Sequence, residues 1–330
     1  MHAGPIDPMK PSADEICVAM LGGQVPGMAP LDLRRAPSDG PRLAIERLLR
    51  GAFERGPVWV AFSGGRDSSA LLAIAAHVAR TDGFDSPIPV TMVFPEVSDT
   101  DEEGWQRLVL ERLGLLEAWV RLEPGEDLDM IGPYAQRVLR RHGVLVPPNA
   151  HAGLPMLDAM GGHGTLVSGA GGDELMEGRP QRLTSAIWSR RRVRANELTG
   201  CVVDDLSGAL QRRAIRRTTF LHHFHWLAPA TWHRRVAEEI EERSVAPIRF
   251  DSLLRRAFTD RHFRAADHAY GLLAGDLGVD VLMPFVEREV VGAFAASWGY
   301  RFPGERARSL RPLVGDLLPE ELITRESKAE

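Results

Sequence analysis

One stretch of the sequence predicts the fold more directly than the rest: Val58-Trp59-Val60-Ala61-Phe62-Ser63-Gly64-Gly65-Arg66-Asp67-Ser68-Ser69. It opens as an apolar run typical of a strand, turns at two glycines, and continues into Ala-Leu-Leu-Ala-Ile-Ala-Ala, a run typical of a helix. Glycines let the backbone approach phosphate oxygens, and the first amides of the following helix point at the same anion. The hydroxyls of Ser63 and Ser68 can donate as well. The stretch therefore predicts a site for pyrophosphate.

Asp67, inside this stretch, has a different predicted role. A carboxylate beside a triphosphate is repelled unless a cation lies between them, so we expect Asp67 to hold Mg²⁺. The alternative for the whole stretch is an ordinary glycine-rich turn between a strand and a helix.

The segment Ser63–Ser68 resembles the SGGxDS loop of the ATP pyrophosphatases, which cleave ATP between the α- and β-phosphates. This group includes asparagine synthetase, β-lactam synthetase, argininosuccinate synthetase, NAD and GMP synthetases and several tRNA-modifying enzymes. Arg66 departs from the family pattern, in which this position is often apolar, and such a charged side chain should point to solvent or to a phosphate. The resemblance implies that ATP is bound by Phe62, Ser63, Gly64, Gly65, Asp67 and Ser68.

A second segment repeats the order of strand, glycine turn and acid at a helix start: Thr165-Leu166-Val167-Ser168-Gly169-Ala170-Gly171-Gly172-Asp173-Glu174-Leu175-Met176. It resembles the SGEGxDElF signature of asparagine-synthetase-type enzymes, and its separation from the first loop suits that family. The resemblance implies that Asp173 is the second Mg²⁺ ligand, facing Asp67 across the pyrophosphate, and that Gly169 and Gly171 belong to the site. Acids are also favoured at helix N-termini, so plain capping is the alternative for Asp173 and Glu174.

Lysine is almost absent from the chain. Lysine and arginine total 40, and only Lys10 and Lys328 are lysines, which leaves 40 − 2 = 38 arginines. Lys10 lies in a proline-rich leader and is interpreted as incidental. The segment Leu317–Lys328 resembles the family's closing LLPEEL…R..K, which implies that Lys328 stabilises charge on the adenylate and the developing oxyanion. A compact ammonium suits that task better than a planar guanidinium; the alternative is a tail lysine without a role.

Composition indicates a globular enzyme: 330 residues, 44% hydrophobic and 26% charged, enough for one large or two medium-sized domains. A net charge of −5 gives no global attraction to nucleic acid or anionic membrane. Cys17 and Cys201 lie too far apart for a CxxC site and indicate reduced thiols in a cytoplasm. The N-terminus shows no signal pattern, and no run approaches the roughly 20 apolar residues of a membrane span. A Walker-type NTPase is excluded, because no lysine follows a glycine loop.

Strand-like and helix-like segments alternate through the first half of the chain. After the first strand we expect strands at 88–94, 118–122 and 165–168, and helices at 68–80, 101–113 and around 150–160. This alternation predicts an α/β fold with a doubly wound, Rossmann-like parallel sheet that binds ligands at the carboxyl ends of its strands. We divide the chain into an irregular leader (1–40), a nucleotide-binding core (41–178) and a mainly helical substrate region (179–330) that returns Lys328 to the active site.

Two further features bear on the resemblance. In the family the second strand lies beside adenine, which makes Val93 and Phe94 candidates for the purine pocket; ordinary core packing is the alternative. The segment Leu282–Val291 resembles the family's PFLD..LV, with Val286-Glu287 in place of Leu-Asp. The resemblance therefore covers residues from about 41 to 328.

The helical region carries two arginine clusters, 190–194 and 212–217. Such clusters are one sign of an RNA-binding surface. In a chain that uses arginine in place of lysine, runs of this kind also arise on solvated helix faces, and we expect the second explanation to hold.

The resemblance implies a two-step reaction. ATP binds with its pyrophosphate on Ser63–Ser68, and a substrate carboxylate, of an amino acid or a peptide, attacks the α-phosphate to give an acyl-adenylate and pyrophosphate. An amine then attacks the acyl carbon, Lys328 stabilises the negative charge, and AMP leaves.

Two departures from the family limit the identity of the product. Glutamine-dependent asparagine synthetases begin with a glutaminase domain whose nucleophile is the cysteine exposed after Met removal, whereas residue 2 here is His2. We therefore expect the amine to be free ammonia, a product supplied by a partner protein, or part of the substrate. The family's acid or tyrosine in the second loop, which takes the amine proton, is replaced by Ala170, and Asp99, Glu174 and Glu177 are weak substitutes.

Three hypotheses remain open from the sequence. The first is an ATP-dependent amide-forming ligase that acts on a peptide or natural product, as do the lasso-peptide macrolactam cyclases, which the absent glutaminase and the GAGGDE loop resemble. The second is an asparagine synthetase that uses free or partner-supplied ammonia. The third is a nucleotide-binding pseudoenzyme that serves a partner. We expect a cytoplasmic protein with a partner that supplies ammonia or presents a peptide, and no nucleic-acid or membrane partner.

Overall fold

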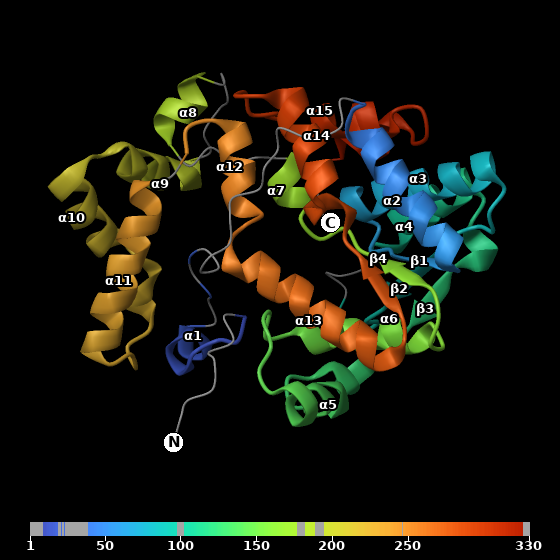
Figure 1. Ribbon diagram of the computed structural model, residues 1–330, viewed down its shortest axis with the longest axis horizontal. Coiled ribbons are helices and arrows are strands. Elements are labelled where there is room, and N and C mark those ends of the chain that lie inside the picture. Colours follow the sequence, from blue (N-terminus) through green and yellow to red (C-terminus); the bar gives the residue numbers. More distant parts are fainter. Residues whose placement is uncertain are drawn as a thin grey trace.

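Five short segments form a parallel sheet at the centre of the protein in a computed structural model (Figure 1). The strands are β1 (Val58–Ala61), β2 (Ile88–Met92), β3 (Val120–Leu122), β4 (Thr165–Val167) and β5 (Asp280–Leu282), and they lie in the order β3-β2-β1-β4-β5. All four pairings are parallel. The predicted α/β fold with a Rossmann-like parallel sheet is confirmed.

The structure describes residues 9–18, 21, 23, 39–97, 102–176, 182–188, 195–245 and 247–325, with only the backbone of residues 188 and 195–197. Lys328 lies outside the described residues, as do Asp99, Glu177 and the arginine cluster 190–194.

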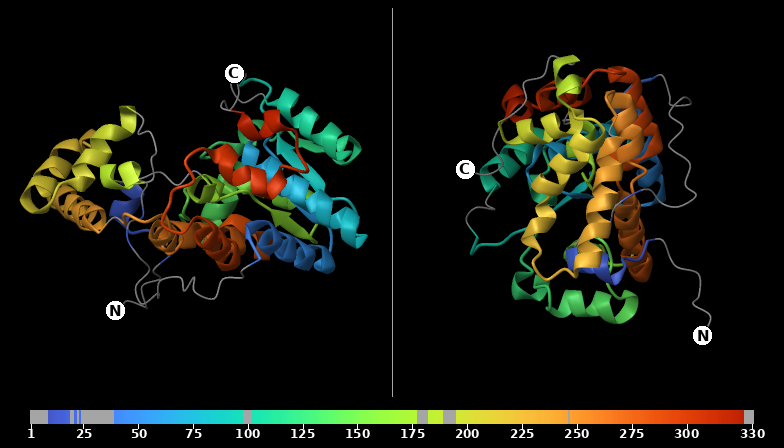
Figure 2. Two further views of the ribbon diagram at one scale, coloured as in Figure 1. Left: turned by 90° about the horizontal axis from the view of Figure 1, so that it is seen from above. Right: turned by 90° about the vertical axis from the view of Figure 1, so that its left-hand side faces the viewer.

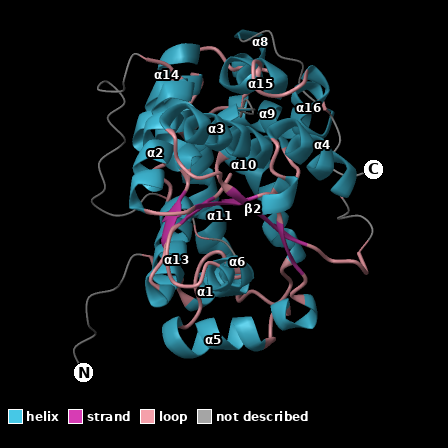
Figure 3. Ribbon diagram, turned by 90° about the vertical axis from the view of Figure 1, so that its right-hand side faces the viewer, coloured by secondary structure: helices cyan, strands magenta, loops and turns pink. Residues whose placement is uncertain are grey.

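Helices cover both faces of the sheet (Figure 3). Two large clusters of buried apolar side chains lie between the helices and the sheet, one on each face. One face carries α2 (Pro41–Arg55), α3 (Arg66–Asp82), α4 (Glu103–Leu113), α14 (Arg288–Trp298), α15 (Arg306–Val314) and α16 (Glu320–Thr324). The other face carries α5 (Pro133–His142), α6 (Leu154–Ala159) and α13 (Arg261–Leu277). Because the sheet is buried on both sides, its central strands are mostly apolar, with buried Thr91 in β2 and Thr165 in β4 as the polar exceptions.

Helix α3 is the central helix of the first face. Its residues from Ala70 to Ala75 are completely buried, and alanine and leucine are strong helix formers. The helix starts at Arg66, directly after the glycine turn, and ends at Gly83, whose φ of 77° only glycine adopts easily. The predicted helix at 68–80 is therefore confirmed and is longer at both ends.

The other predicted elements are found with small shifts. The strand expected at 118–122 begins at Val120, because Leu116–Ala118 forms a 3₁₀ turn, η3. The segment expected to be helical around 150–160 is split into a 3₁₀ turn, η5 (Ala150–Gly153), and α6. Further 3₁₀ turns are η4 (Gly125–Leu128), η6 (Phe220–His223) and η7 (Pro284–Val286).

The C-terminal region is mainly helical, as predicted, but it also contributes strand β5 to the sheet. Sequence analysis missed this strand, which lies between helices in the otherwise helical half of the chain. Val281 of β5 lies opposite Leu166 of β4 in the register. The C-terminal region therefore completes the sheet beside the second glycine loop.

A group of helices projects from one end of the molecule, away from the sheet (Figure 2). It comprises α8 (Leu183–Trp188), α9 (Ala195–Asp205), α10 (Gly208–Thr218) and α11 (Pro229–Ser244). Val236 of α11 packs with Leu221 and with Val18 of α1 (Ala13–Val18), so the N-terminal helix braces this group. The remaining helices, α7 (Gly172–Met176) and α12 (Phe250–Ala257), lie between this group and the sheet (Figure 1). No helix of the described segments is long and apolar enough to cross a membrane.

Candidate active site

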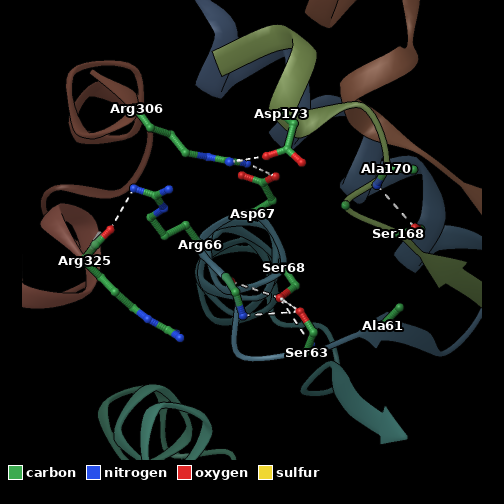
Figure 4. A pocket seen from close by; sticks show the side chains of 12 residues that line it. Ala61, Ser63, Arg66, Asp67, Ser68, Ser168, Ala170, Asp173, Arg306 and Arg325 are labelled. Carbon is green, nitrogen blue, oxygen red and sulfur yellow. Dashed lines mark hydrogen bonds and ion pairs between the residues drawn. The ribbon is translucent and has the colours of Figure 1, made fainter. Parts of the chain in front are cut away.

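The two glycine loops lie side by side because β1 and β4 are neighbouring parallel strands. Val58 is opposite Thr165 and Val60 is opposite Val167, so the two strands end at the same edge of the sheet. The carboxyl edge of a parallel sheet is the place where α/β folds bind ligands. A cavity of about 290 Å³ opens at this edge (Figure 4).

Most residues that line the cavity carry a charge or a hydroxyl, and they come from three parts of the chain: the two loops and the C-terminal region. The predicted site residues that line it are Ser63, Gly65, Asp67, Ser68, Gly169 and Asp173. The other lining residues are Ala61, Arg66, Ser168, Ala170, Arg306 and Arg325.

The other predicted site residues that the structure describes, Phe62, Gly64, Val93 and Gly171, do not line this cavity. The side chain of Phe62 is buried, and its backbone N–H donates to the carbonyl of Val90 at 2.8 Å. The N–H of Val93 donates to the carbonyl of Leu122 at 2.8 Å, so this residue extends the pairing of the second and third strands. The purine-binding role of Val93 stays a prediction, as does the role of Lys328, which the described residues do not include.

Two hydroxyls organise the first loop before any ligand binds. The Ser68 hydroxyl donates to the carbonyl of Gly65 at 3.0 Å and accepts from the backbone N–H of Ser63 at 3.3 Å. The Ser63 hydroxyl accepts from the N–H of Gly65 at 3.3 Å and lies 3.2 Å from the Ser68 hydroxyl. Its hydrogen can therefore turn either to Ser68 or to an anion in the cavity. Such preorganisation lowers the entropy that binding would otherwise cost.

Gly64 can only be glycine in this loop. Its φ is +83°, and a Cβ atom there would lie 2.8 Å from Cγ of Gln106. Gln106 is buried, and its side-chain amide donates to the carbonyl of Ser63 at 3.0 Å. Helix α4 therefore fixes the loop from behind, and the glycine makes room for that contact.

The predicted metal ligands, Asp67 and Asp173, converge on one guanidinium. Arg306 of α15 donates to Oδ2 of Asp67 and to Oδ1 of Asp173 (Figure 4). The side chain of Arg306 is 5% exposed and that of Asp67 is 16% exposed, whereas that of Asp173 is 58% exposed. The two carboxylates thus already share a cation between them, and Asp67 is the deeper member of the pair.

Gly172 allows this approach of the two loops. A Cβ atom on Gly172 would lie 2.3 Å from Oδ2 of Asp67, well inside the contact distance. Gly171, with a φ of +85°, would place a Cβ atom 2.6 Å from Cγ1 of Val286. The run of glycines before Asp173 is therefore needed for close packing as well as for the turn.

The described residues fit a magnesium ion bound with a nucleotide. Oδ1 of Asp67 is buried and has no hydrogen-bond partner among the described residues. Burial raises the pKa of this carboxyl above its ordinary value, and the charge of Arg306 opposes part of the rise, so a cation beside the group favours its charged form. No cluster of three or more potential metal ligands occurs in the described part of the chain. Mg²⁺ in nucleotide sites needs only one or two carboxylates, with phosphates and water completing its shell.

Two hydrogen bonds, one donated from each side, hold the C-terminal segment to the first loop. The guanidinium of Arg325 donates to the carbonyl of Gly64 at 3.1 Å, and the guanidinium of Arg66 donates to the carbonyl of Arg325 at 2.8 Å. Arg325 also pairs with Glu102 at 2.7 Å and lies over the ring of Trp105 at 4.7 Å. Besides lining the cavity, Arg66 therefore anchors the segment that leads to Lys328, a role its predicted orientation did not include.

Arg306 and Arg325 are the cavity residues that sequence analysis missed. Arg325 stands in the quoted LLPEEL…R..K segment, so the family pattern could have pointed to it. Nothing in the sequence around Arg306 separates it from the many other arginines of the chain. Only the docking of α15 against α3 and α7 brings it to the two carboxylates.

No described residue replaces the base missing at Ala170. The carboxylates among the described residues that line the cavity are Asp67 and Asp173, which form the predicted metal pair. Glu174, one of the weak substitutes, is exposed and does not line the cavity. The other two, Asp99 and Glu177, lie outside the described residues.

Comparison with known proteins agrees with this arrangement. The family model described as asparagine synthase matches residues 44–330, which is most of the chain and includes both loops and the C-terminal segment. No curated protein matches the chain.

Proposed function

Because the chain belongs to the asparagine synthase family and is an ATP-using amide ligase, we propose that it activates a carboxylate as an acyl-adenylate and joins it to an amine. Pyrophosphate and AMP are the other products. The observation that carries the proposal is the meeting of the first loop and the Asp67–Asp173 pair around one cavity at the carboxyl edge of the sheet.

In the first half-reaction the loop holds the pyrophosphate part of ATP. The hydroxyl of Ser63 and the first amides of α3, at Arg66 and Asp67, belong to residues that line the cavity and can donate to phosphate oxygens. The guanidinium of Arg306 adds positive charge at the same side. These groups stabilise pyrophosphate as it leaves, which is a step in which negative charge on the leaving group grows.

Asp67 and Asp173 are the proposed ligands of Mg²⁺. The ion would supply positive charge that offsets the charge of the phosphates and of the leaving pyrophosphate. Arg306 forms ion pairs with both carboxylates. Each carboxylate must therefore give up part of its contact with Arg306 in order to bind Mg²⁺ when the nucleotide enters.

Lys328 is the proposed group for the second half-reaction, as the family resemblance implies. It follows Arg325 by three residues, and Arg325 is held to the first loop through its side chain and its carbonyl. The hydrogen bond from Arg66 to the carbonyl of Arg325 therefore holds Arg325, three residues before Lys328 in the sequence, beside the first loop.

The amine partner is proposed to be the N-terminal α-amine of a peptide or a similar natural product. The described residues that line the cavity include no carboxylate besides the metal pair, so a strong base for an ammonium group is absent from that set. An α-amine has a pKa of about 7.7–8.0, whereas a lysine amine has one of about 10.4, so near pH 7 a much larger fraction of the α-amine is neutral. The neutral amine attacks the acyl carbon, the bond from that carbon to AMP breaks, and the proton that the nitrogen then loses passes to the departing AMP or to water.

Exchange of labelled pyrophosphate into ATP tests the proposal. The exchange is measured with Mg²⁺ and either aspartate or peptides that carry a free side-chain carboxylate. We expect exchange with a peptide and none with aspartate. Exchange with aspartate alone would favour an asparagine synthetase, and exchange with no carboxylate, although ATP still binds, would favour a pseudoenzyme.

A further inference from the structure

Helix α10 (Gly208–Thr218) carries four positive charges and no negative charge. Its sequence, GALQRRAIRRT, contains Arg212, Arg213, Arg216 and Arg217. Like charges three and four positions apart lie next to each other on a helix and destabilise it. A bias toward arginine explains why these cations are not lysines, but it does not explain why no acid accompanies them.

The four arginines form one outward face. Gln211 and Ile215, one turn apart, are buried and define the inner side of the helix. All four arginine side chains are exposed. Leu210, which is 67% exposed, shares a face with Arg213 and Arg217, because they lie at i, i+3 and i+7. We call Leu210 and the four arginines the α10 basic face.

Two acids on the helices before and after α10 in the chain interact with residues other than the α10 arginines. Asp204 of α9 pairs with Arg243 at 2.6 Å, and Glu239 of α11 accepts from Thr219 and pairs with Arg243 at 3.2 Å. None of the four α10 arginine side chains makes an ion pair or hydrogen bond with any described residue. By contrast, arginines of the sheet region such as Arg42, Arg50 and Arg137 each pair with a nearby acid.

We propose that the α10 basic face docks an acidic, amphipathic segment of a partner protein. Glutamate or aspartate side chains at helical spacing would pair with the arginines, and an apolar side chain would cover Leu210. Charge complementarity of this kind steers association and fixes orientation. The face lies on the group of helices that projects from the end of the molecule, so a bound partner would leave the catalytic cavity open (Figure 2).

The observations favour a protein over nucleic acid or membrane. The chain has a net charge of −5, which repels long polyanions outside this one face. The four arginines span six residues, or roughly 9 Å of helix, which is a short track for a phosphate backbone. The exposed aliphatic side chain of Leu210 offers a contact for an apolar side chain rather than a stacking platform for a base.

Fluorescence anisotropy tests the proposal with a defined probe. The probe is a labelled 14-residue helical peptide with glutamates at i, i+3, i+4 and i+7 and one leucine, and its comparator has glutamine at each glutamate. In the test variant Arg213, Arg216 and Arg217 are changed to glutamine. In the matched control Arg112, Arg255 and Arg288, which also pair with no described acid, are changed to glutamine, so both variants have the same net charge.

We expect the test variant to bind the acidic peptide about tenfold more weakly than the wild type, and the control to bind within about twofold of it. Equal weakening in both variants, or none in either, would overturn the proposal. So would tighter binding of polyuridylate, or of vesicles of phosphatidylglycerol and phosphatidylcholine, with the same dependence on the α10 arginines. Thermal unfolding checks that both variants fold. The proposed ligase activity can fail without affecting this result, because the peptide assay needs no ATP.

Discussion

The two glycine loops follow the same plan of strand, turn and acid at a helix start, yet they differ in almost every contact. The first loop is tied down by hydroxyls and by Gln106, and it opens the fully buried helix α3. The second opens α7, which the structure describes as far as Met176, and among the described residues its hydroxyl contact is a long bond from the N–H of Ala170 to Ser168 at 3.4 Å. The first loop is held in place by several hydrogen bonds, whereas the main role of the second loop is to position Asp173.

This difference assigns separate tasks to similar sequences. A rigid loop with several donors suits an anion that must be bound tightly in one place. A helix start that brings one exposed carboxylate suits a ligand position that water can share.

The largest effect is expected at the two acids. Asp67→Asn should lower pyrophosphate exchange about 10³-fold and Asp173→Asn about 10²-fold, because the deeper carboxylate is less easily replaced by water. The measurement is exchange rate at saturating Mg²⁺. Glu174→Gln, next to Asp173 but outside the cavity, serves as the control and should keep the wild-type rate. An unchanged rate in both aspartate variants would remove the metal assignment.

The next effect is expected at the glycines. Gly172→Ala should lower exchange about 10²-fold, since its Cβ atom would meet Oδ2 of Asp67 at 2.3 Å and displace the ligand. Gly169→Ala should stay within a few-fold of wild type, because its nearest neighbour would lie at an ordinary 3.4 Å. Equal rates for the two variants would show that the two loops do not need to approach so closely.

A smaller effect is expected at the serines. Ser68→Ala removes a buried hydroxyl with partners at both ends of the first loop, and KM for ATP should rise about tenfold. Ser168→Ala removes only the long bond from Ala170, and KM should change by less than about threefold. Steady-state kinetics with varied ATP separates the two. A larger change at Ser168 would reverse the roles given to the loops.

The smallest effect is expected at Arg66. Arg66→Leu, which restores the apolar side chain often found in the family, should lower amide formation about fivefold by removing the hydrogen bond to the carbonyl of Arg325. Arg66→Lys should recover part of the loss. Limited proteolysis provides a second readout, because cleavage near the C-terminus should become faster in Arg66→Leu. If neither rate nor cleavage changes, this hydrogen bond is incidental.

The sheet and both loops could be predicted because their signals are local. Glycines at fixed positions, an acid after each turn, and apolar runs before and after are read within about a dozen residues. The alternation of strands and helices predicted the parallel sheet, whereas the pairing of β1 with β4 is known from the structure. The convergence of Asp67 and Asp173 was predicted from the family resemblance, and the structure places them on one cation.

What could not be predicted depends on long-range packing. Arg306 reaches Asp67 from 239 positions away, and Arg325 reaches Gly64 from 261 positions away. Arg306 does not differ locally from the others in a chain that contains 38, whereas Arg325 stands in a segment that resembles the family pattern. Strand β5 was missed because it lies in the otherwise helical half of the chain, far along the sequence from β4. The contacts of Arg306 and Arg325 and the pairing of β5 with β4 form only when the chain folds.

The central proposal for this protein is that its two loops together form a site at which ATP is cleaved between its α- and β-phosphates. ³¹P NMR of ATP incubated with the protein, Mg²⁺ and the carboxylate that supports exchange tests it directly. We predict AMP and pyrophosphate with the wild-type protein, and intact ATP with Asp67→Asn or after removal of Mg²⁺. Formation of ADP and phosphate, or equal turnover by Asp67→Asn, would contradict the claim.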